Sequence, residues 1–71
     1  MSIKIKFGPN NSVEKAVDQY PTVDDILRDD DLKALMGFGN NVEAHVNGNA
    51  GVSILQDNDE VTLVTRASTK G

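Results

Sequence analysis

The chain begins with a strict alternation of apolar and charged positions. Residues 3–7 read Ile-Lys-Ile-Lys-Phe, the period-two pattern of a strand with one buried face. Residues 8–11 read Gly-Pro-Asn-Asn, and these residue types favour turns because they supply a positive or a fixed φ. A weaker alternation follows over residues 12–18, carried by Val13 and Val17. The N-terminal part is therefore predicted to form a β-hairpin.

The apolar spacing then becomes helical. Val23, Ile26 and Leu27 have i, i+3, i+4 spacing and share one face of a helix. Thr22 precedes them and Asp25 follows three residues later, which is the order of a capping box. The pattern predicts that a helix begins at Thr22.

An acidic triplet interrupts this helical stripe. Asp29-Asp30-Asp31 separates it from Leu32, Leu35 and Met36, which resume the helical spacing in a second phase. Gly37 then stands where a helix commonly ends. We expect a helix followed by a short helical turn.

The second half of the chain alternates again. Residues 42–46 predict a third strand, and Asn47-Gly48 predicts a type I′ turn because both residue types tolerate positive φ. Residues 52–55 predict a short strand or edge segment. Residues 61–65, rich in β-branched side chains, predict the last strand.

This order of elements predicts an α+β fold. We expect a mixed four- to five-stranded sheet with one helix packed across one face, formed by residues 1–66 as one domain. Residues 67–71 carry no apolar pattern and are expected to be a flexible tail. The residues expected to fill the core are Ile3, Ile5, Val23, Ile26, Leu27, Ala44, Val46, Leu55, Val61 and Leu63.

Composition narrows the function. The chain has 71 residues and no cysteine, which excludes disulfides and thiolate metal sites and favours the cytoplasm. Its net charge of −4 and its few aromatic residues argue against nucleic acid as a partner. No apolar stretch approaches the roughly 20 residues that span a bilayer. We therefore expect a cytoplasmic monomer without a cofactor or membrane association.

The polar residues form no catalytic constellation. His45 is the only histidine and is expected to be exposed, without a catalytic role. The acidic residues between Asp24 and Asp31 could bind a divalent cation or a basic partner, but their spacing does not fit an EF-hand loop. Helix-start acids on a solvated face are the favoured interpretation. The chain is accordingly not expected to be an enzyme.

Two segments resemble a known family. Val46-Asn47-Gly48 and residues 55–63, Leu-Gln-Asp-Asn-Asp-Glu-Val-Thr-Leu, resemble the small sulfur-carrier proteins of molybdopterin and thiamine biosynthesis. Asn58 stands where that family usually has glycine, and asparagine also tolerates the left-handed conformation. The resemblance implies a ubiquitin-like β-grasp fold.

The resemblance also implies a chemistry. These carriers end in Gly-Gly, which an activating enzyme adenylates, and this chain has Lys70-Gly71 at that place. Gly71 is therefore the expected carrier terminus, with an activating-enzyme-like protein as the expected partner. Residues 69–71 further resemble the end of PRTRC protein C, a ubiquitin-like component of bacterial plasmid-borne gene systems.

In a β-grasp sheet the first, last and third strands are neighbours, so their outward residues share one surface. Ubiquitin-like proteins commonly bind partners there. The outward residues expected to form this surface are Lys4, Lys6, His45, Thr62, Val64 and Arg66, with Glu43 beside them. The favoured hypothesis is a non-catalytic protein-interaction module. The alternatives are a carrier activated at Gly71 and a regulator that adds its 52–55 edge to a partner.

Overall fold

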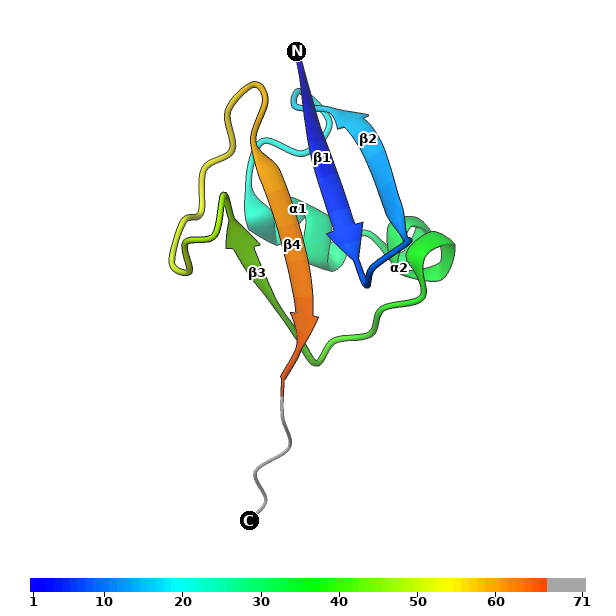
Figure 1. Ribbon diagram of the computed structural model, residues 1–71. Coiled ribbons are helices and arrows are strands. Elements are labelled where there is room, and N and C mark those ends of the chain that lie inside the picture. Colours follow the sequence, from blue (N-terminus) through cyan, green and yellow to red (C-terminus); the bar gives the residue numbers. More distant parts are fainter. Residues whose placement is uncertain (67–71) are drawn as a thin grey trace.

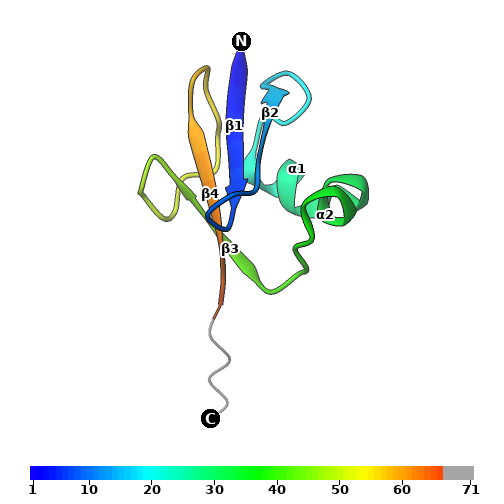
Figure 2. The ribbon, with the colours of Figure 1, turned by 45° about the vertical axis from the view of Figure 1, so that its right-hand side comes forward.

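Four strands form one mixed sheet, and two short helices cover one of its faces (Figures 1 and 2). The structure, a computed structural model, describes residues 1–66, so the predicted tail of residues 67–71 lies outside the described part. The elements are β1 (Ser2–Phe7), β2 (Ser12–Ala16), α1 (Val23–Arg28), α2 (Asp30–Met36), β3 (Val42–Val46) and β4 (Glu60–Thr65). The coarse prediction of a small α+β domain with a mixed sheet is confirmed.

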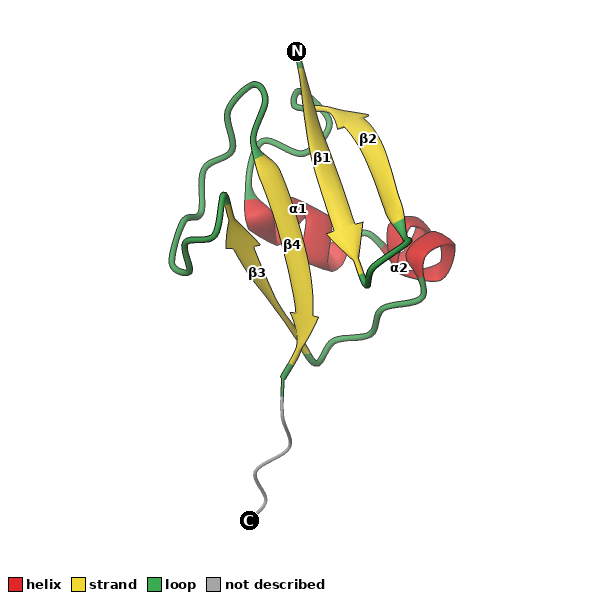
Figure 3. Ribbon diagram, in the orientation of Figure 1, coloured by secondary structure: helices red, strands yellow, loops and turns green. Residues whose placement is uncertain are grey.

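The sheet has the strand order β2-β1-β4-β3. The first and last strands are its centre and run parallel, whereas β2 and β3 pair antiparallel with them at the two edges. β1 and β2 are joined by a turn that begins at Gly8, whose φ is 87°. β2 ends at Ala16, two residues before the predicted end of that strand. The helices connect the two halves of the sheet on its far side in Figure 3.

Two helices replace the single predicted one. The Thr22 hydroxyl accepts the Asp25 N–H, and the Asp25 carboxylate accepts the Thr22 N–H, which completes the predicted capping box. Asp29 then leaves the helical conformation, with φ −81° and ψ 107°, and its side chain caps α2. The break at the acidic triplet is confirmed, but the segment after it is a helix of seven residues that ends at Gly37. None of the helices within residues 1–66 is long and apolar enough to cross a membrane.

The core lies between the helices and the sheet. Eight of the ten predicted core residues are buried, whereas Leu27 and Ala44 are only partly buried and pack against the core from its margin. Sequence reasoning left out five buried residues, since their burial depends on the second helix, the loops and the start of β3. These are Tyr20, Leu32, Met36, Phe38 and Val42.

The turn after β3 has the predicted geometry. Asn47 and Gly48 have φ of 53° and 85°, and Val46 and Asn49 exchange both backbone hydrogen bonds across them. The predicted strand at residues 52–55 is reduced to an isolated bridge between Ile54 and Thr22. The sheet described by residues 1–66 therefore has four strands, the lower number of the predicted four to five.

Candidate functional site

The outer face of the sheet, away from the helices, is the candidate site. Thr62 lies at its centre, with Lys6 of β1 opposite it on one side and His45 of β3 opposite it on the other. Residues that are Cα partners point to the same face, so these three side chains share a surface. Lys4 precedes Lys6 by two residues in β1, and Val64 follows Thr62 by two residues in β4, so both point to the same face. Arg66 follows the end of β4 and is exposed.

Acidic side chains interleave with these cations. Glu60 lies opposite Lys4 in the parallel pair, and its Oε2 lies 2.8 Å from Nζ of Lys6. The Lys6 ammonium, through this hydrogen bond and its charge, lowers the pKa of Glu60. Glu14 lies opposite Lys4 on the other side. Sequence reasoning missed both glutamates, because only the register of three strands brings them beside the lysines.

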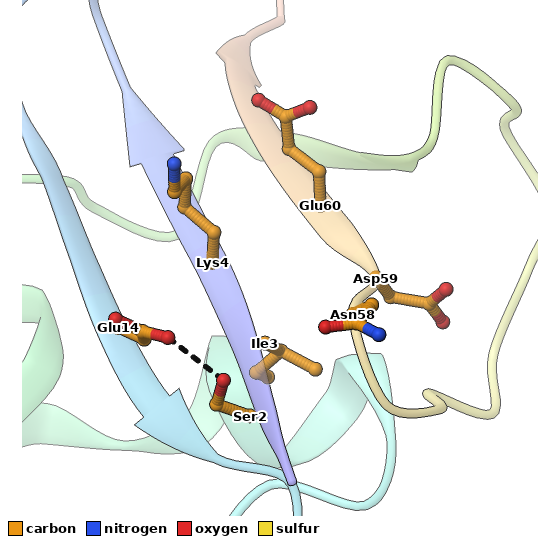
Figure 4. A pocket seen from close by; sticks show the side chains of 7 residues that line it. All are labelled: Ser2, Ile3, Lys4, Glu14, Asn58, Asp59 and Glu60. Carbon is orange, nitrogen blue, oxygen red and sulfur yellow. Dashed lines mark hydrogen bonds between the residues drawn. The ribbon is translucent and has the colours of Figure 1, made fainter.

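A polar depression of about 300 Å³ lies near the start of β1 (Figure 4). Ser2, Lys4, Glu14, Asp59 and Glu60 are among its lining residues. Their carboxylates are already engaged: Ser2 Oγ donates to Glu14, Lys6 pairs with Glu60, and both oxygens of Asp59 accept hydrogen bonds. Within residues 1–66 no group of three or more His, Asp or Glu side chains is placed to hold a metal ion. The contacts of these carboxylates connect β1 to β2 and to β4, and they hold the turn before β4.

A second depression, of about 520 Å³, lies at the opposite end of the same face. Residues 6–9 and 62–65 line it, and its surface is mostly apolar. Phe7 supports it from behind through an edge contact with Phe38, with ring centroids 5.9 Å apart. Val64 is 40 % exposed here. We name this feature the apolar depression.

His45 corrects a prediction. Its side chain is only 33 % exposed, and its Nε2 is buried without a hydrogen-bond partner among the described residues. Oε1 of Glu43, on the same face of β3, is 3.6 Å away. Alternation along the strand placed His45 on the outer face, but only the neighbouring strand determines how much of the ring is covered.

The acidic run has structural roles. Asp25 closes the capping box of α1, Asp29 caps α2, and Asp24, Asp30 and Asp31 lie in the first turns of the two helices. Negative side chains at those positions are stabilised by the helix dipole. This placement agrees with the interpretation as helix-start acids.

Two predicted sites remain, the 52–55 edge and Gly71. Ile54 of the 52–55 segment is 67 % exposed, while the backbone of residues 53 and 55 is bonded to residues 21–23. Gly71, the expected carrier terminus, lies outside the described residues. Comparisons of the chain with protein-family models, with curated proteins and with solved structures give no match.

Proposed function

We propose that this protein is a ubiquitin-like β-grasp domain that acts as a non-catalytic module and binds a protein partner through the outer face of its sheet. The strand order β2-β1-β4-β3, with parallel central strands and the helices on one face, supports the fold assignment. The absence of cysteine from the sequence supports the reducing cytoplasm as its compartment.

The observation that carries the proposal is the position of Val64. It is an exposed aliphatic side chain at the wall of the apolar depression, with the polar residues Lys6 and Thr62 beside it. Small protein interfaces commonly have this arrangement, in which a few apolar anchors are surrounded by a polar rim. The carboxylates of the polar depression are occupied by structural hydrogen bonds, which supports binding rather than catalysis.

The test compares two exposed aliphatic side chains on opposite faces. Val64 is 40 % exposed on the sheet, and Leu35 is 63 % exposed on α2. Val64→Asp and Leu35→Asp each add the same charge at the surface, and an amide spectrum confirms that each variant is folded. We expect Val64→Asp to lose the partner that wild-type protein captures from its own host, and Leu35→Asp to keep it. Equal capture by all three proteins contradicts the proposal.

The carrier hypothesis predicts a different effect of deleting Gly71. Deletion of Gly71 leaves non-covalent capture unchanged if the sheet face is the functional surface, whereas a carrier loses its activity. The intact mass of the untagged protein from its own host distinguishes the two further. A species with a terminal oxygen replaced by sulfur supports the carrier, and a single unmodified mass supports the binding module.

A further inference from the structure

β4 extends beyond its pairing with β1. The β1–β4 ladder ends at Phe7 and Leu63, whereas the β3–β4 ladder continues to Thr65. The chain leaves β1 at Gly8 and turns back toward β2, so in Figure 1 the end of β4 runs past the arrowhead of β1. Val64 and Thr65 therefore have a neighbouring strand on one side only, within the described residues 1–66.

The hydrogen-bond pattern shows which backbone groups point to the open side. Arg66 N–H donates to Asn41 and Asn47 N–H donates to the carbonyl of Glu60, so the even-numbered residues of β4 face β3. Lys4 N–H donates to the carbonyl of Asp59, so the odd-numbered residues face β1. Successive residues of a strand alternate in this way. The N–H and C=O of Thr65 thus point to the side where β1 has ended.

The open side of Thr65 coincides with the apolar depression. Gly8 and Pro9 form the opposite wall, and proline has no N–H with which to continue the ladder. An unpaired strand edge next to an apolar recess suits an extended peptide, because main-chain groups bind the peptide backbone and the recess takes an alternate side chain.

The charge beside the apolar depression indicates which side chains the peptide carries. Among the described residues 1–66, Lys6 is the only charged residue that lines the depression, and none of its lining residues there is a carboxylate. The Lys6 side chain is 41 % exposed and its ammonium bonds Glu60. An ammonium has three donors, so it can donate to a second carboxylate as well.

We propose that an extended peptide of the partner adds as a strand to β4 at Thr65, with one aliphatic side chain in the apolar depression and a neighbouring carboxylate at Lys6. This inference rests on the proposed binding function and names the chemistry of its partner. The chain's own residues 67–71 lack the required group, since their sequence, Ala-Ser-Thr-Lys-Gly, has no large aliphatic side chain.

The test uses a defined probe, the peptide acetyl-Asp-Val-Thr-Val-Thr-amide, titrated into ¹⁵N-labelled full-length protein. We expect the Thr65 amide resonance to shift with a dissociation constant on the order of 1 mM, corresponding to about −4 kcal/mol, and the exchange of that amide with solvent to slow by about tenfold when the peptide is near saturation.

Two variants at one position separate backbone pairing from surface contact. Thr65→Pro removes the N–H that points to the open side and fixes φ, at a position where proline is tolerated in a strand, while Thr65→Val keeps the donor and the side-chain shape. We expect Thr65→Val to bind as wild type and Thr65→Pro to lose at least most of the affinity. The amide spectrum of Thr65→Pro verifies its fold, and Val64→Asp provides a second loss-of-binding variant that leaves the backbone intact.

The outcomes also separate this inference from the proposed function. Wild-type affinity in folded Thr65→Pro overturns strand addition, as does a response around His45 without one at Thr65. No response of Thr65 at about 5 mM peptide, roughly five times the expected dissociation constant, overturns it too. In each of these cases the Val64→Asp capture experiment still decides the proposed function. If the Thr65 amide resonance shifts with protein concentration in the absence of peptide, a second copy of this chain is the occupant. That result overturns the proposal of a partner peptide.

Discussion

The Tyr20 hydroxyl donates a hydrogen bond to Oδ2 of Asp29, the residue at which α1 ends and α2 begins. The other oxygen of that carboxylate accepts the N–H of Leu32 at 3.0 Å and so caps α2. One carboxylate therefore connects the segment after β2 to the break between the helices. Since a carboxylate accepts and a phenol donates, the pair stabilises the neutral tyrosine and the ionised aspartate.

This pair predicts an unusual tyrosine titration. The hydrogen bond to Asp29, aided by burial and by the charges of Asp29 and Asp31, raises the pKa of Tyr20 to about 12. Tyr20 is the only tyrosine and there is no tryptophan, so phenolate absorbance reports this residue alone. We expect a midpoint near 12 in the wild type and a midpoint closer to the ordinary 10.0 in Asp29→Ala.

The matched control for that titration is Asp31→Asn, which removes only the smallest of the causes. It is expected to lower the midpoint much less than Asp29→Ala does. The raised pKa also makes the native state lose stability as pH rises through the window from about 10 to about 12, because the unfolded chain ionises first. An identical midpoint in wild type and Asp29→Ala contradicts the assignment.

Acid is also expected to destabilise the fold, because two carboxyl groups have lowered pKa values in the folded state. Tyr20 lowers the pKa of Asp29 below 3.8, and Lys6 lowers that of Glu60 below 4.5. A depressed carboxyl pKa contributes stability above the unfolded value, and this is lost as pH falls through the folded value. Urea midpoints measured between neutral pH and pH about 2 are expected to fall less steeply in Glu60→Gln than in wild type. Parallel curves for the two proteins contradict the contribution of Glu60.

Two isoleucines test the core. Ile26 is 0 % exposed beneath the sheet, whereas Ile54 is 67 % exposed. Ile26→Ala removes buried methyl groups and leaves a cavity, so we expect a loss of about 3 kcal/mol in the free energy of unfolding. Ile54→Ala is expected to change it by less than about 0.5 kcal/mol. Similar denaturant midpoints for the two variants would contradict the assignment of Ile26 to the buried core.

Asn58 tests the turn before β4. Its φ is 72°, in the left-handed region, and its N–H donates to the carbonyl of Ser2 at 2.8 Å. Asn58→Ala keeps that donor but meets the steric cost of positive φ, so we expect a loss of about 1 kcal/mol. Asn58→Gly has no such cost and is expected to be close to wild type. Thermal unfolding of the two variants checks this, and the reverse order of stability contradicts it.

Local sequence predicted the elements whose causes are local. The alternation at Ile3 and Ile5 produced a strand, Thr22 and Asp25 produced a helix start, and Asn47-Gly48 produced a turn with two positive φ values. Local sequence failed to predict the structure where a contact with a distant segment determines whether an element forms. Residues 52–55 contain strand-forming side chains, yet only Ile54 finds a bridge partner, in Thr22, and so no fifth strand forms.

The candidate site divides in the same way. Strand parity alone, for each strand by itself, put Lys6, Thr62 and Val64 on an outward face. Only the register between strands decided that Glu60 pairs with Lys6, that the side chain of His45 is only 33 % exposed, and that β4 continues two residues beyond its pairing with β1. The physical reason is that side-chain direction follows from the period of one strand, whereas register is set when the hydrophobic faces of all strands pack on the helices together.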